Sequence, residues 1–152
     1  MTTAVHGLEE LKALTGRDLG HTDWLQIDQN RVDTFADATD DHQWIHVDPE
    51  RAATGPFGGT IAHGYLTLAL LIPLMTELLD VSGVRMSINY GLEKVRFPAP
   101  VPVGAKIRLK GRVASADKVA GDGVQITIDF TVEIEGSVKP ACVARGIYRH
   151  YA

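Results

Sequence analysis

The sequence predicts an α+β fold in which an antiparallel sheet wraps one apolar helix. Residues 61–79 are apolar at nearly every position, which is typical of a helix buried on all sides. Four later segments follow the period of β-strands, and the segment 124–135 alternates apolar and polar side chains throughout. Helices and strands that occupy separate halves of one chain indicate an α+β layout. The expected core is therefore one helix held in the curve of one sheet.

The first forty residues predict two helices and a strand that lead toward residues 40–46. Leucines recur at helical spacing over residues 7–15, and Gly16 can end that helix. Apolar and polar residues alternate closely enough over residues 21–28 to predict a first strand. Asp28 is a good N-cap for the helix that follows. Residues 40–46 therefore follow a packed helix.

The central helix is expected over residues 61–79, with a regular start near Gly64. Pro73 should bend it or end its regular part, because proline lacks the N–H that an α-helix uses. A membrane span is the alternative, but it needs roughly 20 apolar residues. His63, Gly64, Pro73 and Glu77 interrupt this run. We therefore expect a core helix.

The second half of the chain predicts four antiparallel strands. Apolar side chains alternate from Val84 to Leu92, and the alternation then shifts by one residue, which indicates a β-bulge near Glu93 and Lys94. Further strands are expected at residues 106–113, at residues 124–135 and, roughly, at residues 141–149. Polar residues occupy many of the alternate positions in these strands, which predicts a sheet with one face exposed to solvent.

Composition excludes several classes of function. The chain has 152 residues and is expected to form a single domain, 1–152. Its net charge of −4 argues against nucleic-acid binding, and no run of like charge marks a membrane surface. The N-terminus lacks the pattern of a secretory signal. Cys142, the single cysteine, cannot form an internal disulfide and is expected to be a packed small side chain, so a cytoplasmic location is expected.

Asp41 and His46 are the candidate acid–base pair. They stand five residues apart, which is too wide for one helical turn, so an irregular loop is expected to fold back and bring them together. A carboxylate and an imidazole suit proton transfer at neutral pH. The alternative is that both are surface residues that cap neighbouring turns.

The residues after this pair predict a second polar group at a helix start. Asp48 and Pro49 are suited to the N-cap and first position of a short helix that Gly55 can end. A glycine-rich link then leads to His63 and Gly64, where the central helix begins. Backbone N–H groups at a helix start lack intrahelical partners and attract negative charge. The Gly64 N–H is therefore a candidate oxyanion donor.

This segment resembles the MaoC-like (R)-specific enoyl-CoA hydratases and 3-hydroxyacyl-thioester dehydratases, and most of all their nodulation-protein-N-like branch. That family carries Asp-x-Asn-Pro-(aliphatic)-His, then Asp-Pro, a glycine-rich link and His-Gly at the central helix. The positions in register are Asp41, Ile45, His46, Asp48, Pro49, Ala52, His63 and Gly64. Two positions depart, with Gln43 in place of asparagine and Trp44 in place of proline.

The resemblance implies a hot-dog fold that pairs as a homodimer, sheet beside sheet. It implies reversible hydration of a trans-2-enoyl thioester to an (R)-3-hydroxyacyl thioester, carried by coenzyme A or acyl carrier protein, with no tightly bound cofactor. It also implies catalytic roles for Asp41 and His46 on one water, and substrate contacts from Gly64 and Gln43. No nucleic acid or membrane partner is implied.

Three other functions remain open from the sequence. Related hot-dog enzymes are thioesterases, and another possibility is a non-catalytic acyl-binding subunit of a heteromeric dehydratase. A metal site formed by the acidic residues and histidines between residues 40 and 48 is disfavoured, because no tight ligand spacing occurs. His42 is expected to face solvent, and His63 to be a helix cap or a core hydrogen-bonding residue.

Overall fold

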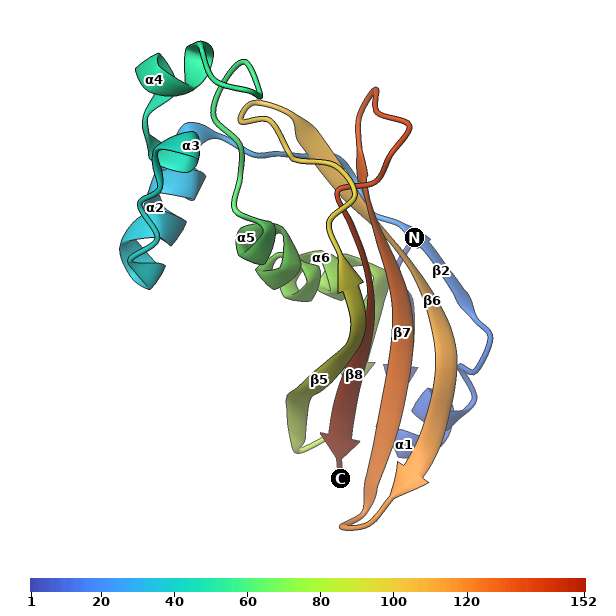
Figure 1. Ribbon diagram of the computed structural model, residues 1–152. Helices are drawn as coiled ribbons and strands as arrows, with labels where there is room; N and C mark the ends of the chain where they lie inside the picture. The colour runs from blue at the N-terminus through green and yellow to red at the C-terminus, as the bar shows by residue number, and fades with distance from the viewer.

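The computed structural model describes residues 1–152 as a curved antiparallel sheet with two helices on its concave side (Figure 1). The sheet order is β2-β6-β7-β8-β5, and β3 also pairs with β6. These strands are β2 (Asp18–His21), β3 (Leu25–Gln26), β5 (Met86–Arg96), β6 (Lys106–Val119), β7 (Gly123–Ile134) and β8 (Cys142–Tyr151). The predicted α+β class and the four long antiparallel strands are confirmed.

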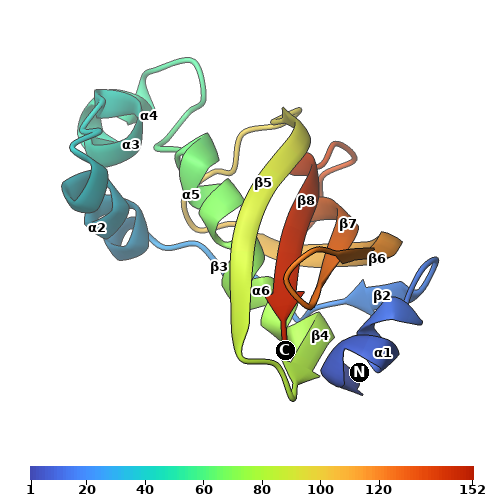
Figure 2. The same cartoon turned by 90° about the horizontal axis from the view of Figure 1, so that it is seen from below.

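The central helix begins at Gly64, as predicted, but it consists of two parts. These are α5 (Gly64–Ala69) and α6 (Leu71–Leu78), which meet at Leu70. Pro73 explains the break, because a proline has no N–H for the carbonyl four residues earlier, at Ala69, and its ring crowds that carbonyl. Viewed from below, both helices lie beside β5 and β8 (Figure 2).

The prediction that this helix is buried on all sides is wrong for the single chain. Its inner side packs into the core through leucines such as Leu74 and Leu78. On its outer side, Tyr65 is 72% exposed and Ile72 is 38% exposed. The sequence is apolar on both sides, whereas the sheet covers only one. The outer side is therefore an apolar surface without a cover.

The long edge strand β5 contains two bulges. The predicted shift lies between Glu93 and Val95, where Lys94 has a positive φ of 50°. A second shift, between Asn89 and Gly91, was not predicted. It changes which side chains share a face, because residues directly opposite each other in a ladder lie on the same side of the sheet. Ile88 is opposite Arg149 and Leu92 is opposite Gly146, so these two apolar residues point to opposite faces.

The N-terminal part contains both confirmed and unexpected elements. Helices α1 (Gly7–Lys12) and α2 (Gln29–Thr39) lie where they were predicted, and the Arg31 N–H donates to the Asp28 cap at 2.8 Å. The strand expected at residues 21–28 is instead the short pair β2 and β3. Strands β1 (Thr3–His6) and β4 (Leu79–Ser82) form a small parallel sheet that was not predicted. Such a pair depends on contacts between residues 76 positions apart, such as Thr3 and Leu79, which local sequence patterns do not encode.

Two short helices stand beyond the end of the sheet. Helix α4 (Pro49–Ala53) is capped by Asp48, which accepts the Arg51 N–H at 3.1 Å, as predicted. Helix α3 (Trp44–Val47) occupies part of the segment where an irregular loop was expected. The Asp48 N–H donates to the Trp44 carbonyl at 3.1 Å and closes this single turn. His46 is therefore presented by a helical turn.

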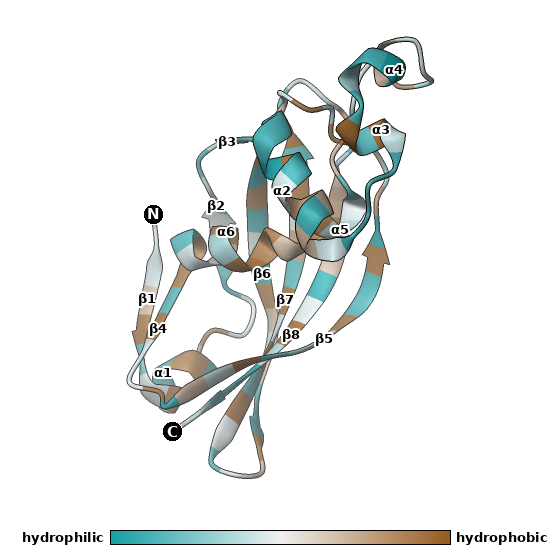
Figure 3. Ribbon diagram, turned by 90° about the vertical axis from the view of Figure 1, so that its left-hand side faces the viewer, coloured by the Kyte–Doolittle hydropathy of each residue, from teal (hydrophilic) through white to brown (hydrophobic).

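One connected core joins the sheet and the helices. It contains 28 buried residues, which run from Val5 near the N-terminus to Tyr148 near the C-terminus. The outer side of α2 is hydrophilic, whereas brown apolar bands mark the strands and the helices they contact (Figure 3). No helix combines the length and the apolar character needed to cross a bilayer.

The packing of β8 yields a stability prediction. A Cβ added at Gly146 would lie 2.6 Å from the Tyr148 hydroxyl and 2.9 Å from the Phe130 ring. Because both neighbours are buried, Gly146→Ala should lower the free energy of unfolding by about 1–3 kcal/mol through overpacking. Gly91→Ala on the adjacent β5 is the control, since nothing lies within 4 Å of its added Cβ. Urea unfolding measures both, and equal losses would contradict the packing argument.

Candidate active site

The candidate site forms where the end of α2, the turn of α3 and the start of α5 meet. Helix α2 ends at Thr39, and Asp40 takes a left-handed conformation with φ 59° and ψ 24°. Aspartate tolerates this region better than most residues because its short polar side chain can bond locally. The reversal at Asp40 directs the chain from α2 into the segment that carries Asp41 and His46.

The structure brings Asp41 and His46 together and adds His63 to them. One carboxylate oxygen of Asp41, one ring nitrogen of His46 and one of His63 all lie within 4.8 Å of one another. The two imidazoles are buried, with 7% and 2% of their surface exposed, whereas Asp41 is exposed. The cluster therefore has a buried imidazole side and a carboxylate side open to solvent.

A backbone contact fixes the tautomer of His46. Its Nδ1 lies 2.7 Å from the Ile61 carbonyl oxygen, which can only accept a hydrogen bond. Nδ1 therefore carries the proton and Nε2 keeps a lone pair. The backbone around His46 is held as well, because Gln29 Nε2 donates to the His46 carbonyl at 2.7 Å and Thr60 Oγ1 donates to Gln29 Oε1 at 2.7 Å. No sequence pattern pointed to Gln29 or Thr60.

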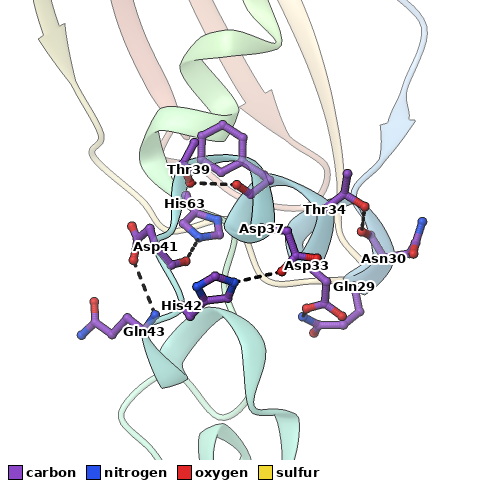
Figure 4. Close-up of polar contacts among 11 residues, drawn as sticks. Gln29, Asn30, Asp33, Thr34, Asp37, Thr39, Asp41, His42, Gln43 and His63 are labelled. Atoms are coloured by element: carbon purple, nitrogen blue, oxygen red, sulfur yellow. Dashed lines mark hydrogen bonds and ion pairs between the residues drawn. The ribbon is translucent and has the colours of Figure 1, made fainter.

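His63 contacts both members of the predicted pair. Its ring stacks on the His46 ring with centroids 3.9 Å apart and an interplanar angle of 24°. Its Nε2 donates to the Asp41 carbonyl at 3.0 Å (Figure 4), and its Nδ1 is buried without a partner. His63 is the N-cap residue of α5 but makes no side-chain cap bond, and the expected alternative, a core hydrogen-bonding residue, is confirmed.

Burial sets the protonation of His46. Desolvation is the largest effect and lowers the pKa of His46 below its ordinary value of 6.5. The bond to the Ile61 carbonyl raises the pKa, the nearby His63 lowers it, and the charge of Asp41 raises it. The net shift is downward, so His46 is neutral at neutral pH. A neutral imidazole with its lone pair at Nε2 can accept a proton.

The same three residues are of the types that bind metal ions, but the ring geometry does not suit one shared ion. An ion bound to a histidine lies in the ring plane, about 2 Å from the nitrogen. The stacked rings of His46 and His63 are nearly parallel, so their planes have no such common point between them. The other metal candidates from the sequence, Asp40, His42 and Asp48, lie outside this cluster.

Gly64 is the first residue of α5, so its N–H has no intrahelical partner. Its lack of a side chain has a specific cause. A Cβ at this position would lie 3.2 Å from the ring of Phe97. The sequence argument was that glycine leaves the backbone open to a ligand oxygen, whereas the structure shows that glycine also makes room for an aromatic ring.

Two other polar residues of the motif point away from the cluster. Gln43 is exposed and makes no cap bond to α3, and its side chain extends away from Asp41 and His63 (Figure 4). His42 is exposed, as predicted, and its Nε2 lies 2.9 Å from Asp37 Oδ1. The Gln43 backbone N–H donates to Asp41 Oδ1 at 3.5 Å, so Gln43 contacts the catalytic candidates through its backbone alone. A substrate contact from its side chain stays a prediction.

The aromatic residue that departs from the family pattern has a structural role. Trp44 packs against Gly55, where an added Cβ would lie 3.0 Å from the indole ring. The Arg51 guanidinium lies over the same ring, 4.3 Å from its centroid. The indole thus packs α3 against α4 and against the loop that follows.

Cys142 is fully buried, and burial raises the pKa of its thiol to about 11, which makes it unsuited to act as a nucleophile.

Comparisons with known proteins show which family this chain resembles. A family model described as MaoC like domain matches residues 10–134. The chain is 56% identical over 143 residues to 3-hydroxyacyl-thioester dehydratase Z of Mycobacterium tuberculosis H37Rv, covering 94% of this chain and 95% of that protein. It is 42% identical over 142 residues to nodulation protein N of Rhizobium leguminosarum, covering 92% of this chain and 88% of that protein.

A solved structure gives the same fold. The (R)-hydratase from A. caviae aligns with a TM-score of 0.71 and 25% identity. The alignment covers 88% of this chain and 94% of that one. The hot-dog fold expected from the sequence is confirmed.

The titration of His46 tests the electrostatics of the site. Its pKa, followed by NMR of the ring protons, should lie below 6.5 in the folded protein and return toward 6.5 in urea. Asp41→Asn should lower the pKa further, because the carboxylate charge favours the protonated ring. A rise of the pKa in this variant would contradict the assigned cause.

Proposed function

Because this chain belongs to the family of MaoC-like dehydratases, and is a hydro-lyase of the enoyl-CoA hydratase and 3-hydroxyacyl-thioester dehydratase type, we propose that Asp41 and His46 together activate one water for addition to a trans-2-enoyl thioester. The product is the (R)-3-hydroxyacyl thioester, and the reverse reaction is its dehydration. The (R) configuration is supported by the name of the (R)-hydratase that shares this fold at 25% identity.

One observation carries the proposal. The carboxylate of Asp41 and a ring nitrogen of His46 lie within 4.8 Å of each other, and the Ile61 carbonyl occupies Nδ1 of that ring. A single water at ordinary hydrogen-bond lengths can bridge two such atoms. It would donate one proton toward Nε2 of His46 and the other toward the carboxylate. This arrangement orients the water oxygen for attack.

The chemical steps balance with these two residues. His46 Nε2 takes a proton from the water while the water oxygen bonds to C3 of the enoyl group. The electrons of the C2–C3 double bond move toward the thioester carbonyl and form an enolate-like intermediate. The proton then passes through Asp41 to C2, which restores the thioester and returns both side chains to their starting states. Dehydration follows the same steps in reverse.

The negative charge that develops on the thioester oxygen needs a donor. We assign that role to the Gly64 N–H, which has no intrahelical partner and lies at the positive end of α5. Gly64 directly follows His63, so the donor is one residue from the ring that stacks on His46 and bonds the Asp41 backbone carbonyl. The resemblance in sequence supports the same assignment.

The exposed apolar residues support a homodimer. β5 is an edge strand of the sheet, and its side chains Met86, Ile88, Tyr90 and Leu92 are 38–55% exposed. Long apolar edges invite pairing with a second chain. We propose that two copies associate along β5. A cytoplasmic location is also proposed, because the single cysteine, Cys142, is buried and unpaired.

Substitution of the two catalytic candidates tests the mechanism. Asp41→Asn and His46→Gln should each lower kcat/KM for hydration of crotonyl-CoA by at least ~10², the usual contribution of a general acid or base. Loss of enoyl absorbance measures the rate. His42→Gln is the matched control, since this exposed neighbour bonds Asp37 and stands outside the cluster. A variant that stays within a few-fold of the parent would remove its residue from the mechanism.

The same assay separates the other functions. Release of free thiol from acyl-CoA without loss of the double bond would identify a thioesterase. Binding of enoyl-CoA without turnover by the wild-type protein would identify a non-catalytic subunit. A ladder of enoyl thioesters on coenzyme A and on acyl carrier protein would identify the carrier.

Oligomeric state tests the proposed association. Light scattering should give twice the monomer mass of 16.5 kDa for the wild type. Met86→Lys with Tyr90→Lys should raise the dissociation constant of the dimer at least ~10-fold, because buried charges without partners oppose association. Val138→Lys is the control, as this apolar residue is fully exposed outside β5. A monomeric wild type would overturn the proposal.

A further inference from the structure

A cavity lies on the concave side of the sheet, away from the catalytic cluster. It measures about 370 Å³ and is bounded by α6, β4, β5, β7 and β8. Asp41, His46 and His63 do not line it. Its long walls are apolar and come from Ile72, Met75, Leu79, Ile126 and Ile128. A flexible hydrocarbon chain would fit such a surface.

The cavity lies along the helical path that starts at the proposed oxyanion donor. Helix α6 continues from α5, and both follow the same concave face beside β5 and β8 (Figures 1 and 2). Ile72 is eight residues beyond Gly64, which is roughly 12 Å along the helix at 1.5 Å per residue. A thioester held at Gly64 can therefore direct a medium-length acyl chain along this face into the cavity.

The strand side of the cavity is not apolar. Tyr148 and His150 are neighbouring inward-facing residues of β8, and each is at least 94% buried. Across the ladder, Ser87 is opposite His150, and its hydroxyl lies 2.8 Å from His150 Nδ1. Asn89 is opposite Tyr148 and also lines the cavity. These four hydrogen-bonding side chains therefore lie close together on one wall of the cavity. A purely hydrocarbon ligand could form no hydrogen bond with them.

These groups have unused hydrogen-bonding capacity. The structure has no hydrogen bond to the Tyr148 hydroxyl, and the single bond of His150 leaves its Nε2 free. His63 Nδ1 is the one fully buried polar side-chain atom without a partner, so His150 Nε2 stays accessible and can bond a ligand oxygen, whereas a hydrocarbon would displace its solvent without replacing that bond. Tyr148 and His150 both line the cavity, but the Tyr148 hydroxyl lies beside Gly146, which is not part of the lining. The polar group available to a ligand is therefore the His150 imidazole with its partner Ser87.

The charge of the cavity selects among polar ligands. Burial lowers the pKa of His150 and raises the pKa of Tyr148 to about 12, so both are neutral at neutral pH. Asp80 is the remaining acidic or basic residue of the lining. No cation there would pair with a ligand carboxylate, and Asp80 would repel it.

We propose that the cavity accepts acyl chains whose far end carries a neutral oxygen group, a hydroxyl or a carbonyl, which bonds to the Ser87–His150 pair. This inference rests on the proposed function, in which the thioester end of the same substrate lies at Gly64. Such a substrate would be an enoyl thioester with an oxygen-bearing tail, and neither a plain fatty acyl chain nor a dicarboxylic one would fit as well.

Matched substrates test this selectivity. For each length from octenoyl to dodecenoyl, three trans-2-enoyl-CoAs are compared that end in a methyl, a hydroxyl or a carboxylate group. The hydroxyl form should exceed the methyl form in kcat/KM by about tenfold at the best length, which is the value of one buried hydrogen bond. The carboxylate form should be the poorest. Equal values, or a preference for methyl at every length, would overturn the proposal.

Variants connect the selectivity to the cavity wall. His150→Leu and, as a second and milder change, Ser87→Ala should each reduce the ratio of hydroxyl to methyl substrate toward one. Thr127→Val is the control, because Thr127 is a buried hydroxyl of β7 that does not line the cavity, and it should leave the ratio unchanged. A ratio that survives both cavity substitutions would place the selectivity elsewhere.

Binding measurements separate failure of the inference from failure of the proposed function. Calorimetry with the corresponding saturated acyl-CoAs reports the same preference without any turnover. If crotonyl-CoA is not hydrated but the hydroxylated acyl-CoA still binds about tenfold more tightly, the cavity inference holds and the proposed reaction fails. If crotonyl-CoA is hydrated and binding shows no preference, the reaction holds and the inference fails.

Discussion

The hydrogen bond from His46 Nδ1 to the Ile61 carbonyl is the interaction on which the candidate site depends. This hydrogen bond keeps its geometry because other contacts fix the backbone at Ile61. The Ile61 N–H donates to the Ile45 carbonyl at 2.9 Å, and Ile61 forms a β-bridge with Pro102. The loop before β6, the segment before α5 and the turn of α3 therefore meet at one residue. If this junction loosened, the lone pair at Nε2 would lose its direction.

The two catalytic candidates differ in environment, and the difference suits their roles. His46 is buried beneath His63, where desolvation keeps it neutral. Asp41 is exposed, and its backbone carbonyl is held by His63. Titratable groups whose surroundings favour different charge states can divide acid and base work between them. His63 contributes to both, since one side chain stacks on the base and positions the carboxylate-bearing loop.

The sequence predicted what local signals determine. In strand β7 apolar and polar residues alternate from Val124 onward, so the strand was predicted. Asp28 and Asp48 each cap a helix by accepting the N–H three residues later, so both helix starts were predicted as well. The pairing of β1 with β4 and the bond from His63 to Asp41 join residues that are distant in sequence. No periodicity encodes such contacts. The motif identified Asp41 and His46 as a pair, whereas the role of His63 depends on a ring stack that only coordinates show.

The wrong prediction of burial on all sides of the central helix has a physical meaning. An apolar pattern in the sequence predicts that side chains are buried, but it does not show whether the same chain or a second chain buries them. The outer side of α5 and α6 and the face of β5 turned away from the helices are apolar in sequence and exposed in one protomer. The unpredicted bulge at Tyr90 places Ile88 and Leu92 on opposite faces of β5, and both side chains are exposed in one protomer. An edge strand with apolar side chains exposed on both of its faces is what association with a second sheet would cover.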